Sequence, residues 1–413
     1  MTFADPTQST AAAAAAPSDS PVRVRDIRLD FFRGIAMFII LIAHTPGNFL
    51  TSWIPARWGF SDATEIFVFC SGMASAIAFG RAFETAGWRM GTARVTFRVW
   101  QVYWAHVGLF FATLALVSFL TTLEWEGTRN YLGQLNLWRF YVETDTGTVT
   151  DLILRFMTLR YVPNYFDILP MYMVVLVMMP IIMALKRVHL GLVFGFMAVT
   201  WLFGQTALVE LLGLPHLELP ADPSSDRAWF FNPFGWQLIF FTGFAFMRGW
   251  IPKPPVTPVL IGIALFIVLA NIPLSNIGVR EFGFDWARDW RRGNAALITK
   301  SDFGVLRYVH FLALAYLMWV LAGDKGDRIR AGTGALGRLW GRILHIILKV
   351  GQQSLAVFVM SMFTARIMGF AMDVLGRDTG TVLLVNLCGA CVLVGTAYVA
   401  GWFKSSPWKK VTT

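Results

Sequence analysis

A histidine and an arginine share one face of an apolar segment near the start of the chain. Arg33 and His44 lie eleven residues apart in the stretch RDIRLDFFRGIAMFIILIAHTPGNF, residues 25–49. In a helix, this spacing returns to within ~20° of the same direction and separates the two residues by ~16 Å. Asn48 continues the same stripe beyond His44. The pattern therefore predicts a functional site that extends along the helix, with Arg33 at one end and His44 at the other.

The two residue types differ in the chemistry that they can perform. A neutral imidazole can take a proton from a hydroxyl group and return it to a leaving group, as acyl transfer to an alcohol requires. An arginine ~16 Å away cannot reach that proton, but its guanidinium binds phosphate oxygens in pairs. The spacing suits a long donor such as an acyl-CoA, whose phosphates stay at Arg33 while its thioester reaches His44. The alternative is that His44 only links two helices by a hydrogen bond.

Two acidic residues at the start of the next apolar segment are candidates to orient the histidine. Glu65 and Asp62 lie one helical turn apart, at about the depth expected for His44. A catalytic histidine commonly needs a group that fixes its second ring nitrogen, and either carboxylate could do so. Alternatively, Asp62 caps the following helix and Glu65 pairs with Arg57 or another cation.

Four further residues are candidates to contact the acceptor or the transferred group. His310 lies one turn from Arg307, and a carboxylate on an acyl group would be a natural partner for that arginine. For His310, an interhelical hydrogen bond is the alternative. Asp167 directly precedes an apolar segment, so it could hold an acceptor hydroxyl or cap that helix. Asn48 is included because it shares the face of His44.

The composition predicts that these residues belong to a membrane protein. Of the 413 residues, 56% are hydrophobic and 15% are charged, whereas soluble proteins average about 25% charged residues. We expect an all-α, polytopic integral membrane protein with about ten transmembrane helices. Segments long enough to cross the hydrocarbon core occupy residues 31–50, 63–80, 99–121, 168–185, 190–212, 234–251, 256–273, 305–322, 346–371 and 381–402.

The distribution of charge predicts the topology. An even number of spans places both termini on one side, and most of the 35 Lys and Arg residues fall on that side, which is therefore cytoplasmic. Residues 1–24 lack the features of a signal peptide and are expected to form a disordered tail. Residues 25–403 form the expected transmembrane domain, and residues 404–413 a cytoplasmic tail. The net charge of +10 reflects this topology and does not indicate nucleic-acid binding.

Several other chemistries find no support in the sequence. Cys388 and Cys391 have a CxxC spacing, but without a second pair or a ligand histidine nearby we interpret them as small residues in a helix. No two histidines have an i,i+4 spacing, so no metal site is expected. A GxxxxGK[ST] loop is also missing, which argues against ATP-driven chemistry. No prosthetic group is expected.

The order of the motifs resembles a known family. Arg33, ten intervening residues and His44 resemble the R-x10-H signature of the membrane-bound acyltransferase-3 superfamily, and EIFVFCSGM at 65–73 is similar to its second-helix pattern. The blocks that resemble the OpgC family are RLDFFRG at 28–34, AHTPGN at 43–48, FSDATEIFVFCSG at 60–72, DILPMY at 167–172, FNPFGWQL at 231–238, RYVHFLALAYL at 307–317 and GQQSLAVF at 351–358. Together the resemblance covers nearly the whole chain.

This resemblance implies an enzyme of the bacterial inner membrane. Such an enzyme moves a succinyl group from its cytoplasmic co-substrate, succinyl-CoA, to hydroxyls of osmoregulated periplasmic glucans. By resemblance, His44 is the general base, and Arg33 has a donor-binding or structural role. Arg94 and Arg98 lie just before the third span, where the superfamily carries arginines that hold the CoA, although their spacing is not a firm motif match.

Two alternatives stay open at this point. The enzyme could transfer an acetyl group to another surface polysaccharide, because succinyl rests on the resemblance alone. The protein could instead be a proton-coupled transporter or flippase, with His44 and Glu65 as a proton relay. The expected partners are the lipid bilayer, acyl-CoA and glucan. The protein could also form a homo-oligomer.

Overall fold

The computed structural model describes residues 26–125, 127, 129–141, 148–222 and 225–410. The expected tail at residues 1–24 lies outside the described residues. The described part is helical throughout, apart from loops and one isolated bridge between Pro220 and Ala228. The prediction of an all-α membrane protein is therefore confirmed.

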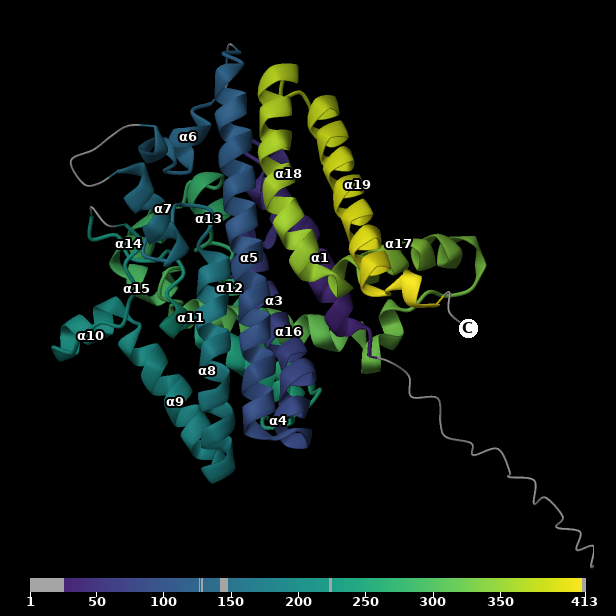
Figure 1. The fold of residues 1–413 in the computed structure, drawn as a ribbon. Helices are drawn as coiled ribbons and strands as arrows, with labels where there is room; N and C mark the ends of the chain where they lie inside the picture. The colour runs from purple at the N-terminus through teal and green to yellow at the C-terminus, as the bar shows by residue number, and fades with distance from the viewer. Residues whose placement is uncertain (1–25, 126, 128, 142–147, 223–224, 411–413) are drawn as a thin grey trace, which may run out of the picture.

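Six helical segments in the described part are long and apolar enough to cross a membrane. The first, Ala63–Thr85, consists of α3 (Ala63–Ser75), a π-helical turn (Ala76–Gly80) and α4 (Arg81–Thr85). The other five are formed by α5 (Gly87–Thr122), α8 (Ile168–Val188), α16 (Val305–Ala322), α18 (Ser354–Leu375) and α19 (Thr379–Lys404). Two shorter apolar helices, α11 (Pro233–Met247) and α12 (Pro258–Ala270), accompany them. Together with α1 (Arg28–His44), they form an elongated bundle (Figure 1).

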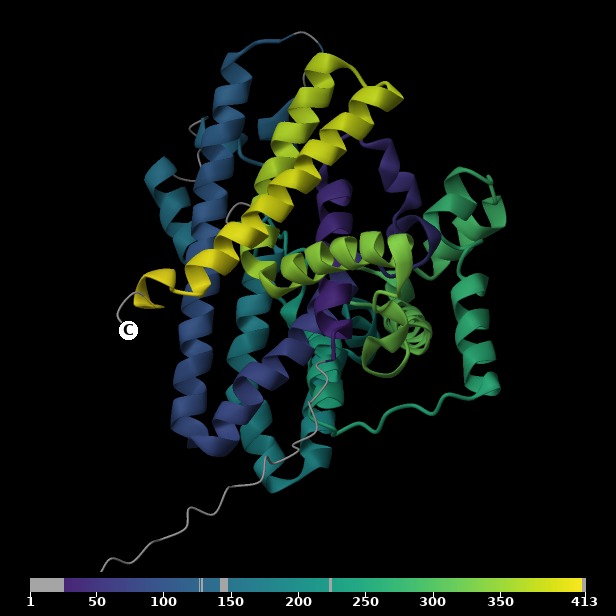
Figure 2. The same ribbon diagram turned by 90° about the vertical axis from the view of Figure 1, so that its right-hand side faces the viewer.

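Two of the ten expected spans are not single helices. The segment 190–212 bends by 85° between α9 (Leu190–Phe203) and α10 (Thr206–Leu212). The segment 346–371 contains the junction between α17 (Gly334–Gln352) and α18. Helix α17 runs across the bundle instead of along it (Figures 1 and 2). The expected count of ten is therefore not confirmed.

Helix α1 lies inside the bundle and packs against α3, α17 and α18. Its buried apolar residues are Ala36, Met37, Ile40 and Leu41. The contact with α17 is close because both helices have glycines at it: a Cβ at Gly34 would collide with the Ile347 carbonyl, and one at Gly351 with the Asp30 carbonyl. Small residues allow such close approach between membrane helices. The helix that carries Arg33 and His44 is thus fixed by contacts with three other helices.

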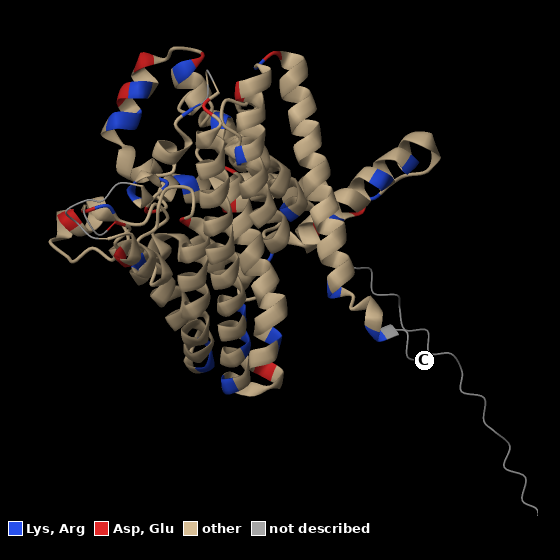
Figure 3. Ribbon diagram, turned by 45° about the horizontal axis from the view of Figure 1, so that its top comes forward, with Lys and Arg blue, Asp and Glu red and all other residues tan. Residues whose placement is uncertain are grey.

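Short helices follow α1 and α5 and precede α16. They include η1 (Phe49–Trp53) and α2 (Pro55–Trp58) after α1, α6 (Tyr131–Gln134), η3 (Trp138–Phe140) and α7 (Val149–Met157) after α5, and α13 (Asn276–Arg280), α14 (Asp285–Gly293) and α15 (Ala295–Ile298) before α16. Further short 3-10 segments are η4 (Asp324–Ile329) and η5 (Pro407–Lys410). Charged residues concentrate near the ends of the long helices and leave their middle turns almost free of charge (Figure 3). This distribution is typical of helices that cross a hydrocarbon layer.

Candidate active site

His44, the last residue of α1, lines a cavity of about 520 Å³. We call it the His44 cavity. Its polar lining comes from five parts of the chain: the segment after α1, α2, the start of α3, α13 and the loop between α15 and α16. The residues used below are Asn48, Arg57, Asp62, Thr64, Asn276 and Lys300. Segments that are far apart in the sequence thus meet around one imidazole.

The hydrogen bonding of His44 assigns its tautomer. Nδ1 lies 2.8 Å from the backbone carbonyl of Ile40, and since a carbonyl oxygen only accepts, Nδ1 carries the proton. The unprotonated nitrogen is therefore Nε2, for which the described residues provide no hydrogen-bond partner. The ring also meets Tyr165 edge-on, with ring centres 5.4 Å apart. This arrangement leaves Nε2 able to accept a proton from a hydroxyl group.

The prediction that Glu65 or Asp62 orients His44 is wrong, because Ile40 holds the second ring nitrogen. Glu65 is fully buried, and its Oε1 accepts hydrogen bonds from Arg307 Nε at 2.8 Å and Nη2 at 2.5 Å. Its Oε2 accepts the backbone N–H of Asp62 at 2.8 Å. Glu65 thus belongs to an ion pair that links α3 to α16. This agrees with the alternative interpretation, in which Glu65 pairs with Arg57 or another cation.

Asp62 does line the His44 cavity, and it also caps α3. Its Oδ1 accepts the backbone N–H of Thr64 at 2.7 Å, and its Oδ2 accepts Lys300 Nζ at 2.5 Å. Burial alone would raise the pKa of this carboxyl, but the charges of Lys300 and Arg307 outweigh burial and hold the pKa below its usual range. Asp62 therefore stays a carboxylate and neutralises Lys300.

The loop between α15 and α16 places Lys300 in the cavity. The Trp236 indole donates to the Lys300 carbonyl at 2.9 Å. Two residues later, the Asp302 carbonyl accepts the Gln205 side-chain amide at 2.5 Å, and the Asp302 carboxylate accepts the Thr206 hydroxyl at 2.7 Å. Both of these donors lie at the bend between α9 and α10, so the bend helps to hold the loop that carries Lys300.

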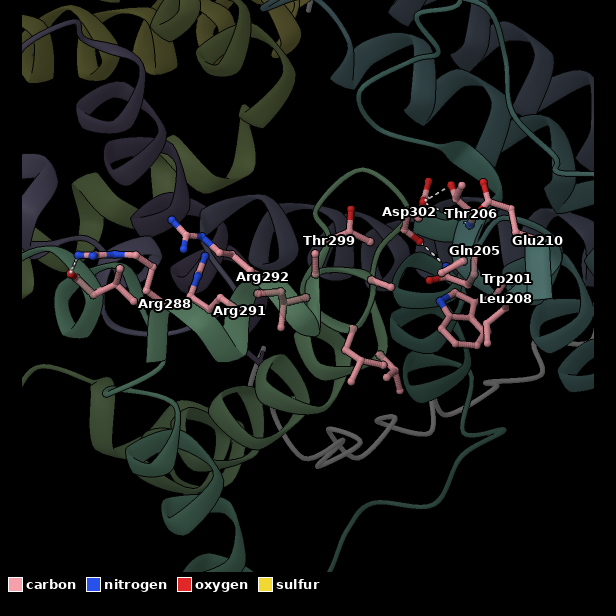
Figure 4. A pocket seen from close by; sticks show the side chains of 17 residues that line it. Trp201, Gln205, Thr206, Leu208, Glu210, Arg288, Arg291, Arg292, Thr299 and Asp302 are labelled. Carbon is pink, nitrogen blue, oxygen red and sulfur yellow. Dashed lines mark hydrogen bonds between the residues drawn. The ribbon is translucent and has the colours of Figure 1, made fainter. Parts of the chain in front are cut away.

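A second cavity of about 740 Å³ lies beside this loop, between the α9–α10 bend and α14–α15 (Figure 4). Arg288, Arg291 and Arg292 lie toward one side of it, and Trp201, Gln205 and Asp302 toward the other. His44 and the residues predicted for the site are not among those that line it. It therefore shares no described lining residue with the His44 cavity.

The other predicted acceptor residues lie in different surroundings. Arg307 is bound to Glu65 and is not available for an acyl carboxylate. The His310 ring accepts the Ser61 backbone N–H at 3.3 Å and contacts the Ser61 hydroxyl at 2.7 Å, outside the His44 cavity. Asp167 is buried and its Oδ1 accepts the Phe230 backbone N–H at 3.1 Å. The His310 contact fits the structural alternative of a hydrogen bond between segments, whereas the Asp167 side chain does not cap α8.

Asn48 does line the His44 cavity, as its position on the stripe predicts. Its amide exchanges hydrogen bonds with Asn386 of α19, at 2.8 and 3.3 Å. Its side-chain oxygen also accepts the Leu50 backbone N–H at 3.1 Å. Asn48 therefore ties the segment after His44 to α19.

The three arginines predicted to bind the donor line one cavity of about 790 Å³ at the opposite end of α1. We call it the Arg33 cavity. Arg33, Arg94 and Arg98 reach it from α1 and α5, and Lys404, at the end of α19, adds a fourth cation. Arg33 donates from Nη2 to the Ser354 hydroxyl, and its buried Nε has no partner in the described part of the chain. This set of donors suits phosphate groups.

The two cavities share no described lining residue. Met37 lies between Arg33 and His44 on α1 and belongs to the same buried apolar cluster as Phe67 of α3 and Phe358 of α18. The Phe67 and Phe358 rings stack with their centres 5.5 Å apart. We call these three side chains the apolar plug.

Sequence reasoning missed several residues of these cavities. The sequence suggests Arg57 only as a partner for Glu65, and it does not single out Lys300 or Lys404. Arg366 was missed although it lies within the expected span 346–371, where an arginine is a signal of function. It is buried in α18 and donates from Nη2 to the backbone carbonyl of His44.

These features define a helical integral membrane protein with a histidine cavity at one end of a central helix and an arginine cavity at the other. Comparison with known families refines this class: the family model described as OpgC protein matches residues 25–405, nearly the whole chain. The chain belongs to the OpgC family. Membership supports a glucan acyltransferase of the OpgC type in general. No curated protein and no solved structure matches the chain.

Proposed function

We propose that the protein is an inner-membrane O-acyltransferase that moves a succinyl group from cytoplasmic succinyl-CoA to hydroxyls of periplasmic glucans. Both termini are cytoplasmic in this proposal. The observation that carries it is the placement of His44, whose Nδ1 is bound to Ile40 while its ring lines a cavity. The arginine cavity at the other end of the same helix supports a phosphorylated donor.

In this proposal, His44 is the general base. Nε2 takes the proton of a glucan hydroxyl as the hydroxyl oxygen forms a bond to the thioester carbon. The carbon–sulfur bond then breaks, and the CoA thiolate takes the proton from the imidazolium as it leaves. The imidazole returns to its neutral form, and the products are the glucan ester and free CoA.

The neighbours of His44 support direct transfer instead of an acyl-enzyme. Thr45 has the hydroxyl closest to His44 in the sequence, but it donates to the Leu41 carbonyl at 2.7 Å within the helix. A hydroxyl bound in this way is not activated by the imidazole, because a serine or threonine nucleophile needs a hydrogen bond to its base. The acceptor sugar is therefore the nucleophile.

The donor would place its phosphates among the four cations of the Arg33 cavity. Its pantetheine arm would then extend along α1 toward His44, a rise of ~16 Å. This path would pass the apolar plug, whose side chains are buried, so donor binding would move Met37, Phe67 or Phe358. Such a plug would also keep water and protons from crossing between turnovers.

Analysis of the native glucans tests the function. Periplasmic glucans from cells with and without the gene are compared by mass spectrometry, and the proposal expects the deletion to remove a mass that corresponds to succinyl. Loss of an acetyl mass, or of substituents on another polysaccharide, would replace the proposed group or acceptor. Purified protein in detergent should also release CoA from succinyl-CoA when glucan is present.

The transporter alternative loses its predicted relay. Glu65 is bound to Arg307 and does not line the His44 cavity. A transporter should also form no glucan ester from purified components, so the same assay distinguishes the two functions.

A further inference from the structure

The His44 cavity contains one cation, Arg57, for which the described residues provide no charged partner. Among its described lining residues, the charged side chains are Arg57, Lys300 and Asp62. Lys300 is already paired with Asp62 at 2.5 Å. The described chain provides no ion pair or side-chain hydrogen bond to Arg57. With His44 neutral, the cavity carries one net positive charge.

The other arginine near this end of α3 is not available for a ligand. Arg307 is 8% exposed and gives two hydrogen bonds to Glu65. It also lies 3.7 Å from Asp62. Removing it from these carboxylates would leave a buried charge unpaired, which is costly. The role that the sequence suggested for Arg307 is therefore better filled by Arg57.

The surroundings of Arg57 hold its backbone in place. It lies in α2, a single turn that starts at Pro55. The Asn276 side chain of α13 donates to the neighbouring Ala56 carbonyl at 3.2 Å. Gly59, which follows α2, packs so closely on the His310 ring that a Cβ at this position would collide with it. The guanidinium is thus presented to the cavity from a fixed turn, and its side chain is only half-buried.

We propose that Arg57 binds the free carboxylate of the transferred acyl group and so selects dicarboxylic acyl donors over neutral ones. This inference rests on the proposed function and names the residue that sets its specificity. The planar guanidinium can pair with both carboxylate oxygens. A donor that ends in a methyl group would leave the cation unpaired in the cavity. Selection would thus come from the charge and not from the size of the acyl group.

A comparison of two acyl donors of similar size tests this inference. Succinyl-CoA and butyryl-CoA are supplied to purified protein, with neutral glucan from the deletion strain as acceptor, and kcat/KM is measured for each. Arg57→Gln should lower the succinyl-to-butyryl ratio about 10- to 100-fold, as expected for one charge-assisted hydrogen-bonding pair. Arg57→Lys should lower it less. Arg280→Gln, which changes an exposed arginine of α13, should leave it unchanged.

The ratio is measured within one preparation, so a partly unfolded variant does not change it. An unchanged ratio in Arg57→Gln, or a wild-type protein that uses both donors equally, would overturn the role of Arg57 while acyl transfer itself stands. Failure of the wild-type protein to transfer either group would overturn the proposed function instead.

Discussion

Arg366 binds the end of the helix that carries His44. Its guanidinium donates to the His44 backbone carbonyl and lies 4.3 Å from the centre of the Tyr165 ring. Tyr165 in turn packs edge-on against the imidazole, and its hydroxyl donates to the Met362 carbonyl at 2.5 Å. Helix α18 therefore positions both the backbone and the ring of His44, without using the ring nitrogens.

The first prediction concerns the base itself. Because Arg366 holds the His44 backbone and not its ring nitrogens, His44→Gln should fold and bind donor as the wild type does. Its rate of transfer should fall about 10²- to 10⁴-fold, the usual loss when a general base is removed. His345→Gln, at an exposed position in α17, is the matched control. A His44→Gln protein that retains most of the wild-type rate would show that another group takes the proton.

The second prediction concerns the Arg33 cavity. Arg94 is exposed and Arg98 is half-buried, so replacing both with Gln should not disturb the fold. The KM for succinyl-CoA should rise about tenfold or more, because each charge-assisted bond to phosphate contributes ~1.5 kcal/mol or more, whereas kcat should change little. Arg89→Gln, on the same helix but outside the cavity, provides the control. An unchanged KM would place the CoA elsewhere.

The third prediction concerns the apolar plug. Phe67→Trp enlarges a side chain that is 5% exposed, so it should hinder passage of the pantetheine arm. Transfer should slow several-fold while equilibrium binding of desulfo-CoA to the Arg33 cavity stays the same. Overpacking also destabilises proteins, typically by about 1–3 kcal/mol, so the thermal midpoint is measured in parallel. Wild-type turnover in a folded Phe67→Trp protein would mean that the donor takes another route.

The sequence was sufficient for features that depend on helical geometry. The spacing of Arg33 and His44 places them at opposite ends of one helix, and the structure has α1 from Arg28 to His44. The breaks inside two apolar segments were harder to find. Gly204 and Gln205, and the polar run Gly351–Ser354, interrupt these segments, but hydropathy averaged over a long window hides short interruptions.

Pairing between distant segments could not be predicted. Glu65 and Arg307 are 242 positions apart in the sequence, and the sequence offered several cations as partners. The same holds for Arg57, which becomes a candidate only when Lys300 is seen to be paired with Asp62. Local patterns identify which residue types are costly in a membrane, but tertiary contacts decide which of them remain free to bind a ligand.

The fourth prediction concerns the Glu65–Arg307 pair. Glu65→Gln leaves a buried guanidinium with a weaker partner, so the free energy of unfolding should fall by about 3–5 kcal/mol. Replacing both residues with Met should restore much of this loss, because a buried pair also bears the cost of removing two charges from water. Asp285→Asn, which breaks an exposed pair with Arg288, should change stability by less than about 1 kcal/mol. Thermal unfolding in detergent measures all three, and equal effects of Glu65→Gln and Asp285→Asn would contradict the prediction.

The fifth prediction concerns the pH dependence of stability. Asp167 precedes α8, and burial raises its pKa to about 6, although the hydrogen bond from Phe230 and the charge of Arg227 oppose the shift. An unfolded aspartate titrates near 4, so the folded state binds the additional proton between about pH 4 and 6. The free energy of unfolding contributed by Asp167 is therefore complete below about pH 4 and is lost as the pH rises through about 6.

Asp167→Asn keeps an oxygen that can accept the Phe230 N–H and removes the buried charge. The variant should be more stable than the wild type at pH 7.5, by about 1–3 kcal/mol, and the two proteins should converge toward pH 4. Asp289→Asn, at an exposed position, serves as the control and should follow the wild type at every pH. If the thermal midpoints of the Asp167→Asn and wild-type proteins run parallel from pH 4 to 7.5, the carboxyl of Asp167 has the same pKa in the folded and unfolded states, and burial at this helix start has no effect on its ionisation.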